Sequence, residues 1–121
     1  SLKFNAFIPK KQITANDDGR YSSYLIAVEK DQLHLIYNDH KKNAERLQEG
    51  KDVKRMTRPK SAVGVITTVD QEGSVVYDQL FRSKDLGTVL VPGKSYQIDE
   101  RNIIIFGEKR SNCRFGLITF Q

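Results

Sequence analysis

Short runs of apolar, β-branched and aromatic residues alternate along this chain with short charged turns, and the pattern recurs as three hairpins. In each hairpin a polar cluster of four residues separates two strand-like runs, which is the ordinary signal for antiparallel strands. The paired runs are residues 24–28 with 33–37, 62–69 with 75–80, and 95–98 with 103–106. The pattern predicts an all-β domain of antiparallel hairpins.

Three further runs extend this prediction to about eight or nine strands. They are residues 2–8, which stop at Pro9, residues 88–91, and residues 113–120. One short helix is expected after Asn43, because Asn favours a helix start and Gly50 favours a helix end. Residues 82–87 are expected to form a loop, so the sequence predicts at most one short helix.

Residues 24–28 and 103–106 are apolar at both odd and even positions, so both faces of these strands are expected to be covered. Covered antiparallel hairpins arise when small sheets stack on one another, as in the blades of a propeller. Such stacked hairpin sheets are the predicted architecture. A closed β-barrel or a β-sandwich is the alternative.

Length and composition predict a single β domain spanning residues 1–121, because 121 residues and 13.9 kDa suit one ordinary domain. No apolar stretch approaches the roughly 20 residues of a transmembrane helix. The chain starts Ser-Leu-Lys without a leader, which indicates a piece of a larger protein. Its single cysteine, Cys113, lies in an apolar strand-like run and is expected to be buried.

Several segments carry a resemblance to a group of known proteins. They are residues 21–24 (YSSY), 33–43, with the turn from Tyr37 to Asn43, 69–73, and 114–117 (RFGL). These segments resemble uncharacterised bacterial proteins that are exported or associated with the cell envelope. The resemblance implies a β-rich, C-terminal part of a larger extracytoplasmic protein, and it implies no catalytic residue.

The densest group of hydrogen-bonding side chains lies where a strand runs into a turn, a usual place for binding residues. This candidate binding site consists of Tyr37, Asn38, Asp39, His40 and Asn43. The structural alternative is that Asn38 and Asp39 close the turn and Asn43 caps the helix. A metal or hydrolytic site on Asp39 and His40 is a further hypothesis.

The sequence carries no Gly-rich phosphate loop, nucleophile elbow or metal-binding Cys/His series. We therefore predict no enzymatic activity, no metal and no cofactor. The predicted function is a non-enzymatic structural or protein-interaction module. Its expected partners are neighbouring domains, a partner protein or further copies of the chain.

The alternative predicted function is binding of a polyanion or nucleic acid. The chain has a net charge of +5 at pH 7, which attracts polyanions, although a positive charge also increases solubility. A basic run could follow a phosphate backbone. It comprises Lys51, Lys54, Arg55, Arg58 and Lys60. Asp52 interrupts this run and Pro59 makes it a loop, which argues against nucleic acid as the partner.

Overall fold

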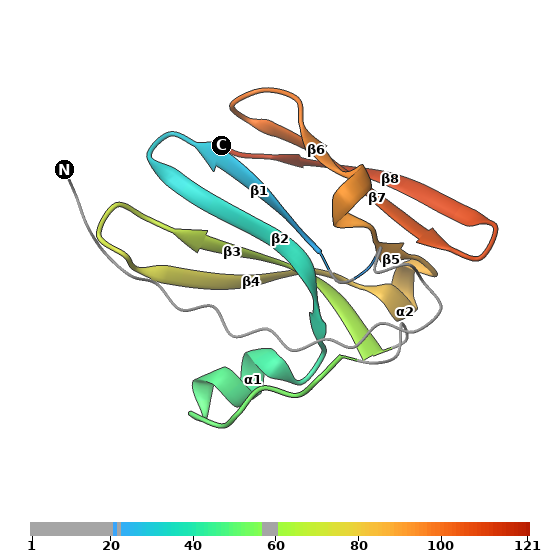
Figure 1. Cartoon of the computed structure of the whole chain (residues 1–121), viewed down its shortest axis with the longest axis horizontal. Coiled ribbons are helices and arrows are strands. Elements are labelled where there is room, and N and C mark those ends of the chain that lie inside the picture. Colours follow the sequence, from blue (N-terminus) through green and yellow to red (C-terminus); the bar gives the residue numbers. More distant parts are fainter. Residues whose placement is uncertain (1–20, 22, 57–60) are drawn as a thin grey trace.

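The computed structural model describes Tyr21, residues 23–56 and residues 61–121, and two antiparallel sheets form most of this part (Figure 1). The predicted strand over residues 2–8 lies outside the described residues. The first sheet has the order β1-β2-β3-β4. Its strands are β1 (Tyr24–Glu29), β2 (Gln32–His40), β3 (Ala62–Val69) and β4 (Val75–Arg82).

The second sheet is organised around β7 (Asn102–Lys109). On one side β7 pairs with two short strands, and on the other side it pairs with β8. These partners are β5 (Val89–Leu90), β6 (Tyr96–Gln97) and β8 (Asn112–Thr119), and the 3₁₀ turn η2 (Pro92–Lys94) joins β5 to β6. The all-β prediction is confirmed, and neither sheet closes into a barrel within the described part of the chain.

Two short helices are present, so the prediction of at most one is wrong. The expected helix after the first hairpin is α1 (Asn43–Gln48), and the second is α2 (Ser83–Leu86). Arg82 Nε lies 2.8 Å from Asp85 Oδ2 across this single turn, and Gly87 ends it with a left-handed φ of 70°. One turn is too short to show helical periodicity, so residues 82–87 looked like a loop.

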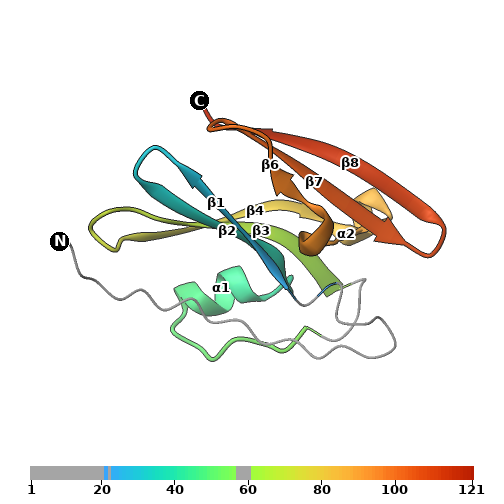
Figure 2. The same cartoon turned by 45° about the horizontal axis from the view of Figure 1, so that its top comes forward.

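The two sheets share one apolar core. Its buried members come from both sheets: Ala27, Ile36 and Ile66 from the first, and Leu90 and Ile103 from the second. The second sheet therefore lies on one side of the first sheet, and α1 lies on the opposite side (Figures 1 and 2). Two small antiparallel sheets packed together agree with the predicted stacking of hairpins.

The opposite face of the first sheet is buried in the middle and exposed at one edge. Tyr37 and Val63 are almost fully buried there. In contrast, Tyr24, Ile26 and Val28 on β1 are each more than half exposed. The expectation that both faces of residues 24–28 are covered is therefore wrong, because β1 is the outermost strand of its sheet.

Close packing between β7 and the start of β5 yields a first prediction. A Cβ atom at Gly107 would lie 2.6 Å from Thr88 Oγ1 and 3.2 Å from Thr88 Cβ, and Thr88 is 2% exposed. We expect Gly107→Ala to lower the free energy of unfolding by about 1–3 kcal/mol, measured by urea denaturation. The loss should shrink in a Thr88→Ala background. An equal loss in both backgrounds would show that this contact is not the cause.

Candidate functional site

Asp39, the centre of the predicted binding site, lies in a closed hydrogen-bond network inside the protein. Its carboxylate accepts hydrogen bonds from the Tyr77 hydroxyl at 2.9 Å and from the Asn43 side-chain amide at 2.5 Å. It also accepts one from the His40 backbone N–H at 2.9 Å. Asp39 is 1% exposed. The network therefore holds β2, β4 and α1 together, and the Asp39 carboxylate does not face solvent.

Asn43 joins the start of α1 to the segment after the helix. Its side-chain Nδ2 donates to the Lys54 carbonyl at 3.0 Å, and its Oδ1 accepts from the Lys54 N–H at 2.7 Å. The helix N-cap is Lys42, without a side-chain cap bond. The expected capping role of Asn43 is therefore replaced by a link to a second backbone segment, which supplies both a donor and an acceptor.

Asn38 and Tyr37 point to opposite faces of β2 because neighbouring strand residues alternate. Asn38 is fully buried, and its Nδ2 donates to the carbonyls of Leu90 at 2.7 Å and Tyr21 at 3.0 Å. The Tyr37 hydroxyl lies 2.9 Å from Thr67 Oγ1. Asn38 thus links the two sheets, while Tyr37 packs on the far face of the first sheet.

His40 is the most accessible member of the predicted site. Its Nδ1 accepts a hydrogen bond from the Lys42 N–H at 3.1 Å. Partial burial lowers the pKa of His40, and the charges of Lys54 and Lys42 lower it further. No group of three His, Cys, Asp or Glu side chains suited to a metal occurs among the described residues. The geometry around Asp39 and His40 is that of a hydrogen-bond network that connects neighbouring elements of the fold.

The basic run is only partly described. Lys51 pairs with Glu49 at 2.7 Å, and both side chains are largely exposed. Lys54 and Arg55 also face solvent. Two members of the run lie outside the described residues, Arg58 and Lys60.

A buried pair that the sequence did not predict lies beneath the end of the chain. His34 Nε2 is 3.4 Å from Glu29 Oε1, and His34 Nδ1 is 2.8 Å from Thr68 Oγ1. The imidazole stacks on Phe120, with ring centroids 4.3 Å apart. Strand alternation places His34 on the same face of β2 as the buried Ile36. Nothing near it in the sequence indicated that residue 120 would cover it.

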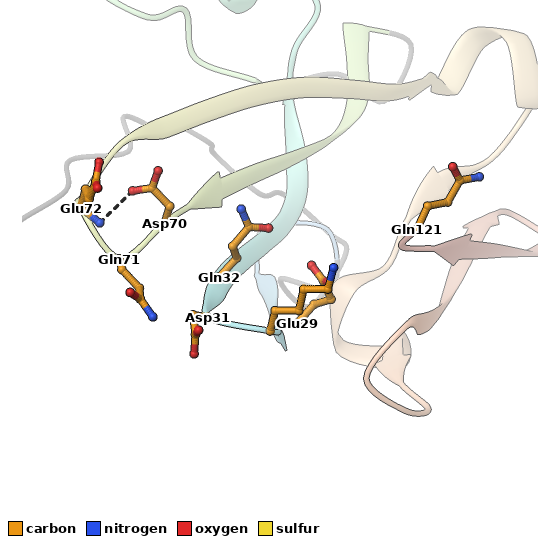
Figure 3. Close-up of a pocket in the computed structure, with 8 residues that line it drawn as sticks. Glu29, Asp31, Gln32, Asp70, Gln71, Glu72 and Gln121 are labelled. Atoms are coloured by element: carbon orange, nitrogen blue, oxygen red, sulfur yellow. Dashed lines mark hydrogen bonds between the residues drawn. The ribbon is translucent and has the colours of Figure 1, made fainter.

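Next to this pair, a hollow of about 490 Å³ opens between the β1–β2 and β3–β4 turns (Figure 3). Acidic and amide side chains line it, including Glu29, Asp31, Gln32, Asp70, Glu72 and Gln121. Asp70 Oδ1 accepts hydrogen bonds from the backbone N–H groups of Glu72 and Ser74, both at 2.9 Å. This carboxylate closes its own turn, and the hollow is an open junction between two turns.

The second sheet presents a contiguous apolar surface to solvent, which we call the outer face. Strand pairing sets Phe115 opposite Phe106, Leu117 opposite Ile104, and Ile104 opposite Tyr96, so all five side chains lie on one face. Phe115 is 72% exposed, Leu117 62% and Tyr96 56%. The rings of Phe106 and Phe115 lie 5.0 Å apart.

Cys113 lies on the outer face as well, and it is exposed, which corrects the expectation of a buried thiol. The cause is that β8 is an edge strand with no described element packed over this face. At the rim, Lys94 Nζ lies 5.3 Å from the centre of the Phe106 ring and 3.4 Å from Glu108 Oε2.

Sequence reasoning missed the outer face, although a signal for it exists. Cys113, Phe115 and Leu117 alternate with Arg114 and Gly116, so the last strand has a more apolar side. Alternation alone does not show whether that side faces the core or solvent. The core instead takes Ile118, from the other side of the strand.

No protein-family model, curated protein or solved structure matches this chain. In the described part of the chain, no helix has the length and apolar character needed to cross a membrane. Any functional conclusion therefore depends on the geometry of the surfaces described above.

The two tyrosines around Asp39 predict a loss of stability at alkaline pH. Burial raises the pKa of Tyr37 to about 12, and burial followed by the charge of Asp39 raises the pKa of Tyr77. In the unfolded chain both hydroxyls ionise near pH 10. Above that pH the unfolded state has lost protons that the folded state keeps, so the free energy of unfolding falls as pH rises.

Urea denaturation between about pH 8 and pH 11 measures this fall. We expect Tyr77→Phe to reduce the slope of stability against pH above pH 10. The control is Tyr96→Phe, because Tyr96 is 56% exposed. A slope that is the same in both variants and in the native protein would contradict the prediction.

Proposed function

We propose that this chain is a non-enzymatic protein-interaction module, part of a larger extracytoplasmic protein, that docks another protein chain on its outer face. One observation carries the proposal: Tyr96, Phe115 and Leu117 are more than half exposed and form one surface with Ile104 and Phe106. Single exposed apolar side chains are common. A contiguous apolar patch with aromatic members is typical of an interaction site.

Selection of peptides from a random linear library displayed on phage tests this function on the intact protein. We expect selected peptides to bind the native protein and to lose at least about tenfold in affinity for the variant Phe115→Ser/Leu117→Ser, equivalent to about 1.4 kcal/mol. The matched control is Val75→Ser/Val76→Ser, because these β4 side chains are 43% and 55% exposed.

Urea denaturation should show that both double variants remain folded. Peptides that bind the Phe115→Ser/Leu117→Ser variant as well as they bind the native protein would contradict the proposal. Failure to enrich any peptide on the native protein would also contradict it.

A second candidate function, polyanion binding through the basic run, has one observation in its favour. Lys42 and Lys54 both lower the pKa of His40, so their charges gather at one place beside α1. Lys51 and Arg55 are exposed nearby in the sequence. A phosphate backbone would meet several cations there.

Binding of a mixed-sequence oligonucleotide at low and moderate salt tests this second candidate. We expect affinity to fall steeply with added salt and to weaken in Lys54→Gln/Arg55→Gln, because each lost phosphate contact reduces counterion release. The control variant is Arg110→Gln, since Arg110 lies in the distant β7–β8 turn. Binding that is insensitive to salt, or weakened equally by Arg110→Gln, would exclude the basic run as the site.

A further inference from the structure

We propose that the free edge of β8 pairs with β8 of a second copy of this chain, in an antiparallel, two-fold dimer with one continuous sheet. The inference goes beyond the proposed function, since the second copy binds at the β8 edge that borders the outer face and leaves the outer face itself open to another partner. It is carried by the direction of the β8 main-chain groups, by the protection of other sheet edges, and by the self-complementarity of β8.

The main chain of β7 shows which β8 groups point to the free edge. The Phe106 N–H donates to Ser95 Oγ at 2.9 Å, and the Phe106 carbonyl accepts from the Val91 N–H at 2.8 Å. Both groups therefore point away from β8. In an antiparallel ladder, residues opposite each other either exchange both hydrogen bonds or exchange none. Phe106 and Phe115 exchange none, so the Phe115 N–H and carbonyl point outward.

The same alternation applies along the strand, so the outward main-chain groups belong to every second residue. These are Cys113, Phe115, Leu117 and Thr119. Their side chains all lie on the outer face. The residues whose main-chain groups have no partner among the described residues thus include Phe115 and Leu117, which have the most exposed apolar side chains. A strand added at this edge would engage both features together.

The β1 and β4 edges of the first sheet have features that prevent the addition of another strand. On β1, the side-chain amide of Gln97 accepts from the Val28 N–H at 3.1 Å and donates to the Val28 carbonyl at 2.6 Å. On the far edge of the same sheet, the β3–β4 register shifts between Gly64 and Val65, and β4 includes Asp78. Bulges, charges and covering groups are the usual means by which proteins block free edges.

The β8 edge has little of this protection. Its eight residues include one charged side chain, Arg114, and no proline. The β7–β8 register is continuous from Asn102 opposite Thr119 to Lys109 opposite Asn112. A long, regular, weakly charged edge is a template for another strand.

A second β8 fits this template well. With the two-fold axis at Gly116, Phe115 lies opposite Leu117 of the other copy, and Arg114 lies opposite Ile118 of the other copy. Apolar side chains then meet on the outer face, and the two arginines stay apart. Glycine at the axis suits the close approach of two strands.

Charge at the two ends of the hairpin favours the same antiparallel arrangement. The hairpin end carries Lys109, the last residue of β7, and Arg110 in the turn, and no ion pair is found for either among the described residues. The turn at the opposite end of β7 carries Asp99, Glu100 and Arg101 and so has a net negative charge. Antiparallel pairing places the basic end of one copy next to the acidic end of the other, which is electrostatically complementary.

Size-exclusion chromatography with light scattering, over a range of protein concentrations, tests the dimer directly. We expect a mass approaching twice 13.9 kDa at high concentration. Leu117→Lys should raise the dissociation constant at least about tenfold, because it sets a charge against Phe115 of the other copy. The matched control is Ile26→Lys, since Ile26 is 53% exposed on the protected β1 edge, and it should leave the dimer unchanged.

A second variant tests the main-chain pairing. Leu117→Pro removes an outward N–H without removing a bond to β7, so it should also give a monomer. The register predicts that Cys113 faces Thr119 of the other copy, so a short bismaleimide should cross-link Thr119→Cys between copies. The Thr119→Cys/Cys113→Ser variant should not cross-link, because the opposing thiol is missing.

The outcomes separate this inference from the proposed function. A monomer at all concentrations that still binds outer-face peptides overturns the dimer and leaves the interaction module standing. A dimer that Leu117→Lys leaves as strong as before also overturns the β8 pairing. A monomer that enriches no peptide overturns both proposals.

Discussion

The contact between two small antiparallel sheets is the interaction on which this structure depends. Ala27 and Ile36 from the first sheet pack with Leu90 and Ile103 from the second, and each sheet supplies cover that the other lacks. Burial of apolar surface stabilises such a contact by roughly 25 cal/mol per Å². Because the second sheet uses one face for this core, its other face remains in solvent, and Phe115 and Leu117 remain exposed.

The pairing of β7 determines which edge of the second sheet is free. Val91 and Ser95 bind the main chain of Phe106 on one side, so the strand that pairs on the other side, β8, has no further described neighbour. The alternation of a strand then gives Phe115 and Leu117 an exposed side chain and main-chain groups without a partner in the described part of the chain. One packing arrangement thus produces the outer face and the free edge together, and this is why the two proposals concern the same residues.

The cluster around Asp39 shows why a polar group in a sequence is hard to interpret. Hydrogen-bonding residues at the end of a strand suit a binding site and a structural joint equally well. The difference lies in Tyr77, whose hydroxyl reaches Asp39 from β4, and in Lys54, whose main chain binds Asn43. These partners are distant in sequence, and no local pattern specifies them.

The sequence by itself determined the hairpins, their turns and the helix near Asn43, because apolar alternation and turn residues act over a few neighbouring positions. It did not determine the helix Ser83–Leu86, a single turn that the Arg82–Asp85 ion pair spans and that Gly87 ends. Nor did it determine which faces of residues 24–28 and 113–120 meet solvent, since both faces of these strands carry apolar side chains. Only the tertiary structure decided that, because the cover comes from residues distant in sequence, such as Leu90 in the core with Ala27 and Phe120 stacked on His34.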